Sequence, residues 1–132
     1  MEKYPAKILV AFTETIDGNK KILDWLLENG YPELAALSTA IRGSDEAVNW
    51  LIKNGYSRFA ALDAAITNDQ KAYQWLKDNH FDLLIILADA CRGKQEAIEW
   101  FNKNGLQIFT RMASIIKKFV DSQEFDYHKM SF

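Results

Sequence analysis

The sequence has few of the residues that tie a chain to a metal, a membrane or a disulfide framework. Cys91 is the single cysteine among 132 residues, so no internal disulfide can form, and neither His80 nor His128 is spaced with it as metal ligands are. The longest early apolar run, 8–12, is far too short for a signal-peptide core or a membrane span. We therefore expect a soluble, cytoplasmic protein that is stabilised by packing and carries no metal or cofactor.

An excess of basic charge is also missing. The chain has 16 Lys and Arg against 18 Asp and Glu, a formal net charge of -2. Neutralising phosphates requires a basic surface, so this balance disfavours generic nucleic-acid binding and gives no reason to expect an anionic membrane as partner. The sequence also contains no phosphate-binding glycine loop and no Ser/His/Asp grouping, and we expect a protein that is not an enzyme.

What the chain has instead is a repeat of 25 residues. Tryptophan recurs at that interval, and Phe125 takes the same position once more. The tryptophans are Trp25, Trp50, Trp75 and Trp100. The copies follow one another without a linker, so we expect a single domain over 1–132. They cover 6–30, 31–55, 56–80, 81–105 and 106–132.

Each copy is expected to form a helical hairpin. In the second copy, Leu34, Leu37 and Ile41 have helical spacing in the first half, and Ala47 and Leu51 have it in the second. Residues that favour a left-handed helix end separate the halves, and plausible N-caps follow them. The separators are Gly18, Gly43, Asn68 and Gly93, and the caps are Asn19, Ser44 and Asp69. The predicted fold is all-α: an α-solenoid of about five stacked helix-turn-helix repeats.

The two helices of a copy differ in bulk and charge. Alanine is frequent in the first helices and tryptophan in the second, so the stack should curve with the first helices on its concave side, and the tryptophans should pack between repeats. Two outer columns alternate in sign and should lie side by side along the stack: Lys21, Glu46, Lys71, Glu96, and Glu28, Lys53, Asp78, Lys103. In the last copy Ser122 and Asp126 replace alanine and leucine, as a polar end cap would.

The stretch 59–80, Phe-Ala-Ala-Leu-Asp-Ala-Ala-Ile followed by a polar turn and a second helix, resembles the helical part of an ankyrin repeat. The likeness extends over nearly the whole chain. The copies have 25 residues rather than 33, which leaves no room for the ankyrin hairpin, and Ala36-Leu37-Ser38 stands where Thr-Pro-Leu-His would begin. The resemblance is to an ankyrin-like helical-repeat protein, and it implies a scaffold that binds other proteins and has no catalytic residues.

One polar cluster is a candidate binding site on the concave side of the central copies, with Glu14 and Lys117 at its ends. Its members are Arg42, Asp63, Asp89 and Arg92. The structural alternative is that Asp89 and Arg92, three residues apart on one helix, simply pair on a solvated face. Cys91 stands in an isoleucine column and is expected in the core, and His80 is expected as a left-handed helix cap in place of glycine.

We therefore expect a protein or peptide interaction scaffold that binds through its concave face. One alternative is a small enzyme that uses Asp63 and Asp89, which a deep pocket around these carboxylates would favour. Another is a nucleic-acid binder, which would need one continuous positive stripe of Arg42, Arg92, Arg111, Lys117 and Lys118. Leu27 and Ile52, where later copies have Lys77 and Asn102, could also form an exposed patch for a partner or for self-association.

Overall fold

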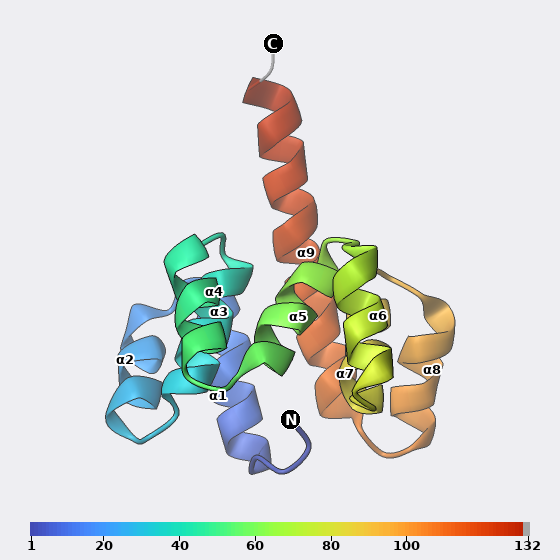
Figure 1. Cartoon of the computed structure of the whole chain (residues 1–132), viewed down its shortest axis with the longest axis horizontal. Helices are drawn as coiled ribbons and strands as arrows, with labels where there is room; N and C mark the ends of the chain where they lie inside the picture. The colour runs from blue at the N-terminus through green and yellow to red at the C-terminus, as the bar shows by residue number, and fades with distance from the viewer. Residues whose placement is uncertain (131–132) are drawn as a thin grey trace.

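The computed structural model describes the backbone of residues 1–130 and the side chains of residues 1–123. Over this range the chain is all-α, and a new helix begins about every 12 residues (Figure 1). The helices are α1 (Ala6–Ile16), α2 (Lys20–Glu28), α3 (Pro32–Ile41), α4 (Asp45–Lys53), α5 (Ser57–Ile66), α6 (Gln70–Asp78), α7 (Asp82–Cys91), α8 (Gln95–Lys103) and α9 (Gln107–Met130). None of them is long and apolar enough to cross a membrane.

The turns within the first four copies follow the predicted chemistry. Gly43 has a φ of 109°, in the left-handed region, and Ser44 accepts a hydrogen bond from the backbone N–H of Ala47 at 3.1 Å. Asn68 takes the left-handed conformation at φ 72°. Lys94 makes no side-chain capping bond at the start of α8, because the lysine side chain has no hydrogen-bond acceptor. Each of these copies is therefore a helical hairpin.

The first helices of the copies form an inner layer that closes on itself. Helices α1, α3, α5, α7 and α9 each pack against the next, and α9 also packs against α1. Arg111 Nη2 on α9 and Glu14 Oε1 on α1 lie 3.0 Å apart across this closure. The alanine-rich helices do lie inside, as expected, but α9 and α1 are neighbours rather than opposite ends of the stack. The described residues thus leave no open concave groove between the first and last copies.

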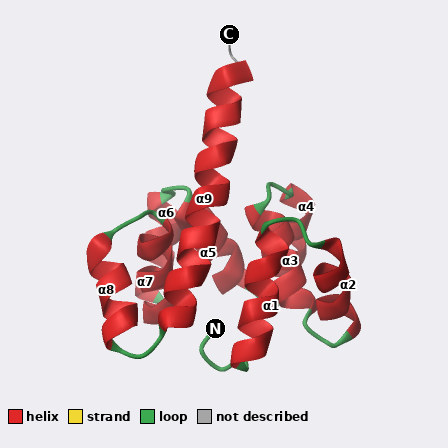
Figure 2. Cartoon of the chain, turned by 180° about the vertical axis from the view of Figure 1, so that it is seen from behind, coloured by secondary structure: helices red, strands yellow, loops and turns green. Residues whose placement is uncertain are grey.

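The second helices form an outer layer (Figures 1 and 2). Helix α2 packs on α1 and α3, α4 on α3 and α5, α6 on α5 and α7, and α8 on α7 and α9. Because the outer helices pack on inner helices rather than on one another, the two alternating charge columns do not lie side by side. None of the ion pairs among residues 1–123 joins members of these columns.

Leucine, not tryptophan, anchors the outer helices. The residue after each tryptophan is fully buried: Leu26, Leu51, Leu76 and Phe101. Three of the four tryptophans keep 38–40% of their surface exposed. Trp50 stacks on Tyr56 and Trp75 on Phe81, with ring centroids 6.1 and 5.8 Å apart, so these rings cover the first residue of the next copy. Trp50 and Trp75 therefore contact the next copy, at the edge of the contact rather than in its buried centre.

The fifth copy is not a hairpin. Helix α9 continues without a break from Gln107 to Met130, through the position where a turn was predicted. Lys118 stands where the other copies have Gly or Asn, and Phe119 stands where three of them have an N-cap. A left-handed lysine and a missing cap would each cost about 1 kcal/mol, which favours the continuous helix. The side chains of Phe125 and Asp126, predicted to belong to an end cap, lie outside the described residues.

Candidate functional site

An apolar groove lies between two outer helices, α2 and α4, and α3 forms its floor. It is a cavity of about 380 Å³ that is open to solvent. Leu23 and Leu27 come from α2 and Trp50 from α4, and the remaining lining residues are Pro32, Ala35, Ala36, Thr39, Ser44, Glu46 and Ala47. We call this cavity the α2–α4 groove.

The groove exists because its floor is made of small side chains. Ala35 and Ala36 on α3 leave the space between the outer helices unfilled. Two copies later the same columns carry the larger side chains of Ile85 and Ile86, which are partly buried against the core. There Tyr73 also donates a hydrogen bond from its hydroxyl to Asp89 Oδ2 at 3.2 Å. The α2–α4 groove thus lies in the N-terminal half of the molecule.

The most exposed aliphatic side chains of the described residues lie on the outer helices of the same half. Leu27 on α2 is 51% exposed and Ile52 on α4 is 53% exposed. Both belong to one column, which continues as Lys77 and Asn102 in the next two copies. The structure thus places Leu27 in the wall of the α2–α4 groove and Ile52 one copy further along.

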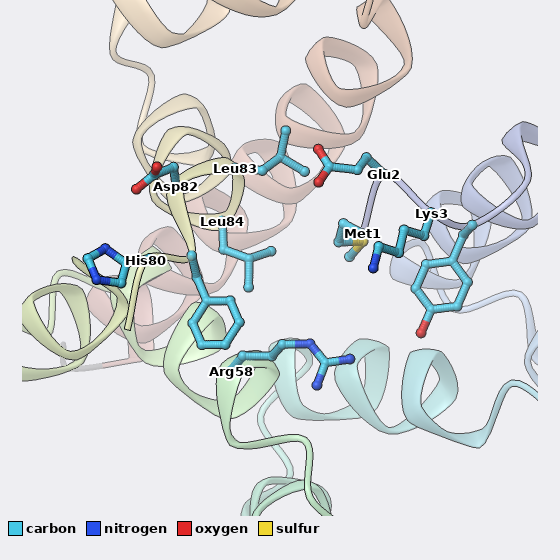
Figure 3. Close-up of a pocket in the computed structure, with 10 residues that line it drawn as sticks. Met1, Glu2, Lys3, Arg58, His80, Asp82, Leu83 and Leu84 are labelled. Carbon is cyan, nitrogen blue, oxygen red and sulfur yellow. The ribbon is translucent and has the colours of Figure 1, made fainter. Parts of the chain in front are cut away.

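A second cavity, of about 440 Å³, lies at the N-terminal ends of α5 and α7, beside the first residues of the chain (Figure 3). Arg58, Lys3 and His80 line it together with Leu83 and Leu84, so its wall mixes basic side chains with aliphatic ones, and we call it the Arg58 cavity. Beside it, the hydroxyl of Tyr4 donates to Glu33 Oε2 at 3.1 Å.

The carboxylate of Glu33 is buried, and its Oε1 has no hydrogen-bond partner. Burial and this neighbouring carboxylate together raise the pKa of Tyr4. The guanidinium of Arg58 lies over the ring of Phe59, 4.7 Å from its centroid, so its charge is partly engaged within the fold. The cavity therefore combines polar anchors with an apolar lining.

Arg42, one of the predicted binding residues, supports the fold at the closure of the inner layer. Its Nη1 donates to the carbonyl oxygen of Ile16 at 2.7 Å, at the C-terminal end of α1. Its guanidinium also lies over the ring of Phe119 on α9, 5.1 Å from the centroid. A cation at a helix C-terminus stabilises the helix dipole, so Arg42 joins α1, α3 and α9.

Asp63, the second predicted residue, is half-buried on α5. In its column, Ser38 hydrogen-bonds Thr15 of the preceding copy at 2.8 Å, whereas Asp63 makes no hydrogen bond or ion pair among residues 1–123. Burial, with a smaller effect from the Asp45 carboxylate, raises the pKa of Asp63 to about 7. None of the main cavities has Asp63 in its wall.

Asp89 and Arg92 both lie in the fourth copy, two copies after Arg42 and one copy after Asp63. Asp89 accepts the bond from Tyr73 and lies 3.5 Å from Lys94 Nζ, while its Oδ1 is buried without a hydrogen bond. Arg92 is exposed and lines a cavity of about 220 Å³ with Lys117. No hydrogen bond or ion pair in the part of the chain described joins any two of the four predicted residues, and no deep pocket surrounds Asp63 and Asp89.

The remaining candidates have local roles. Arg111 pairs with Glu14, and Lys117 Nζ pairs with Asp121 at 2.6 Å, which engages two members of the predicted basic stripe. Cys91 is buried, as predicted, and burial raises the pKa of its thiol. His80 has a φ of 61°, which confirms the predicted left-handed cap. Among the described side chains, those of residues 1–123, no group of three or more His, Cys, Asp or Glu could hold a metal ion.

The sequence identified Leu27 but not the groove beside it. The missed lining residues are Leu23, Ala35, Ala36 and Trp50. The sequence feature that could have predicted them is alanine on the inner helix next to leucine on the outer helix. Comparisons with protein-family models, with curated proteins and with solved structures gave no match. The function must therefore be inferred from the geometry of this chain alone.

Proposed function

We propose that the chain is a protein or peptide interaction module of the helical-repeat class, built from 25-residue ankyrin-like copies without hairpins. Support comes from the regular alternation of helices and from an apolar groove whose wall includes the exposed side chain of Leu27. We place binding in the α2–α4 groove rather than on a concave face, because the inner layer closes through α1 and α9.

The observation that carries this proposal is the exposure of Leu27 beside the open groove. A leucine left half-exposed costs the free energy that its burial would provide, about 1.5–3 kcal/mol on full burial. The same column carries Lys77 in a later copy, so the outer helix folds equally well with a polar residue there. Burial of Leu27 by a partner explains why an apolar residue stands at this position.

The ligand that fits is a short segment presenting two or three apolar side chains, such as one face of an amphipathic helix. The groove holds about 380 Å³, enough for a few aliphatic or aromatic groups, and Trp50 supplies the kind of flat, partly buried ring that is frequent at binding hot spots. Glu46 at the groove gives one charge that a cation on the ligand would meet.

The experiment is selection from a phage-displayed library of helical peptides against the folded protein, followed by titration of the selected peptides. We expect their methyl and indole chemical-shift changes to centre on Leu23, Leu27 and Trp50. The change Leu27→Lys copies Lys77 of the same column, so it should weaken binding at least tenfold, about 1.4 kcal/mol, while the unfolding midpoint stays unchanged.

The matched control is Glu99→Lys on α8, an exposed residue on the outer layer far along the chain from the groove. It also introduces a lysine, with a net-charge change of +2 against +1 for Leu27→Lys, and should leave the affinity of the selected peptides as it was. Peptides that bind with shifts centred on the Arg58 cavity, or that tolerate Leu27→Lys, would contradict the assignment of the groove.

A further inference from the structure

One pair of neighbouring inner helices has no outer helix over it. Each of the four outer helices bridges two successive inner helices, but no described helix bridges α9 and α1, and Figure 2 shows both in front with nothing covering them. The exposed fractions of the side chains on these helices agree with the missing cover. Val10 on α1 is 39% exposed, whereas Ala35 and Ala60, in the same column of covered helices, are 3% and 8% exposed. We call this uncovered strip of α9 and α1 the fifth slot.

The fifth slot is bordered by a cavity of about 480 Å³ beside α8 and α9. Ile98, Thr110 and Ser114 line it, and these occupy the columns of Leu23, Ala35 and Thr39 in the α2–α4 groove. In that groove the second wall is the outer helix α4. Here the equivalent wall is absent among the described residues, so the cavity has one helical wall and an open side.

The chain carries a segment with the length of an outer helix, but α9 holds it away from the slot. The C-terminal half of α9 projects from the body of the molecule (Figure 1). Phe119 is held against Arg42 where the other copies turn back. The projecting stretch 119–130 is about 18 Å long, against about 13.5 Å for an outer helix of nine residues.

We propose that the occupant of the fifth slot is the projecting half of α9 from a second copy of this chain. The two α9 helices would pack antiparallel about a twofold axis, each completing the outer layer of the other. The orientation is the one the fold requires, because every outer helix runs antiparallel to the inner helix that precedes it. The midpoint of α9, Gln107 to Met130, falls between Lys118 and Phe119, so an antiparallel pair matches 107–118 of one copy with 119–130 of the other.

Such an exchange is a form of domain swapping, in which a turn that would fold a segment back on its own chain opens into a straight connection. The four closed copies carry Gly or Asn at the turn, and the fifth carries Lys118 within a continuous helix. The sequence supports the match as well, because Phe125 continues the tryptophan column of the outer helices.

Charge complementarity favours the same occupant. The side chains along the slot include the exposed cations Lys7, Arg111 and Lys118, with Glu14, which pairs with Arg111, and Asp17 at the end of α1 as carboxylates. The projecting stretch 119–130 contains three carboxylic acids and one lysine, although Asp121 already pairs with Lys117 of its own copy. A basic slot facing an acidic segment steers the two copies together and gives the association a dependence on salt.

The test is the mass in solution, measured by sedimentation equilibrium. The wild-type chain should form a dimer of about twice the monomer mass of 15.2 kDa. The double change Lys118→Gly with Phe119→Asp restores the turn chemistry of the other copies and should give a monomer with almost the same helix content. The control Lys118→Arg with Phe119→Leu keeps two helix-forming residues and should stay dimeric.

The salt dependence and the geometry give two further readouts. The change Lys7→Glu should weaken dimerisation at least tenfold at low salt, whereas Lys53→Glu on α4 should not. A spin label on Ser122 of one copy should lie close to a label on Val10 of another, in a mixed dimer. A wild-type chain that is monomeric at about 100 µM, a turn-restoring variant that remains dimeric, or distant labels in the mixed dimer would each overturn the proposal. The slot is separate from the α2–α4 groove, so either proposal can fail without the other.

Discussion

At the scale of single residues, the repeat allows each side chain to be judged against its column. Leu76 is fully buried and belongs to a column of buried residues, while Trp75 next to it remains 38% exposed. Tryptophan is the larger side chain and marks the period in the sequence, yet the smaller neighbour holds the outer helix to the inner layer. Burial, rather than size, decides which of the two contributes more to stability.

We therefore expect Leu76→Ala to lower the free energy of unfolding by about 2–5 kcal/mol, because it leaves a cavity between α6 and the inner helices. Trp75→Ala should cost less, about 1–2 kcal/mol, since it removes one stacked pair and a half-exposed surface. Urea unfolding followed by circular dichroism measures both. A tryptophan variant that is the less stable of the two would contradict this ranking.

Asp63 makes stability depend on pH. Its folded pKa of about 7 lies above the value near 4 that a carboxyl has in the unfolded chain. The unfolded state therefore loses this proton at a lower pH than the folded state does. Stability from this group is complete below about pH 4 and is lost progressively as the pH rises to about 7, by roughly 2–4 kcal/mol in all.

The change Asp63→Asn should remove this loss, so the variant should be more stable than the wild type at pH 8 and no more stable than it at pH 4. Denaturation midpoints across that range measure the effect. Asp78→Asn, at an exposed position of α6, is the control and should leave the profile unchanged. A parallel profile for wild type and Asp63→Asn would show that Asp63 ionises freely in the folded state.

At the scale of helices and turns, one left-handed residue ends each of the first four copies. Gly55 and His80 occupy the same column, with φ of 86° and 61°. A side chain other than glycine is strained in this conformation by about 1 kcal/mol. The fold thus accepts a histidine at the end of the third copy at a measurable cost.

His80→Gly should raise the free energy of unfolding by up to about 1 kcal/mol, and Gly55→His should lower it by a similar amount. The comparison is direct because no atom lies within 4 Å of a Cβ built at Gly55, so strain alone decides the result there. Urea midpoints of the two variants measure it. A loss of stability in His80→Gly would mean that the imidazole makes a stabilising contact in the Arg58 cavity.

The sequence predicted these local features because they depend on local chemistry. Helical spacing, left-handed turn residues and N-caps such as Ser44 act within one copy, and the structure confirms them. The fifth hairpin was predicted from the period alone, although Lys118 and Phe119 lack the chemistry of a turn. The groove and the closure depend on the angle between successive copies, which the side-chain pattern of one copy does not determine.

At the scale of the whole molecule, closure changes what the repeat can do. In an open array each copy contacts only its neighbours, and the end copies fray first. Here α1 and α9 contact each other, so neither is a free end of the inner layer. The surfaces left for partners are then the outer grooves and the uncovered strip of α9 and α1, which is why both proposals lie on the outside of the ring.

The distance between Lys7 on α1 and Gln107 on α9 tests this closure most directly. Both residues are exposed and occupy the same column in the first and last copies, so spin labels can be attached in a Cys91→Ala background without disturbing the Glu14–Arg111 pair. Electron–electron double resonance, with labelled protein diluted in unlabelled protein, should give a distance below about 25 Å, because adjacent helices lie about 8–10 Å apart. A distance of about 40 Å, four helix spacings, would mean that the copies form an open array and that the ring does not close.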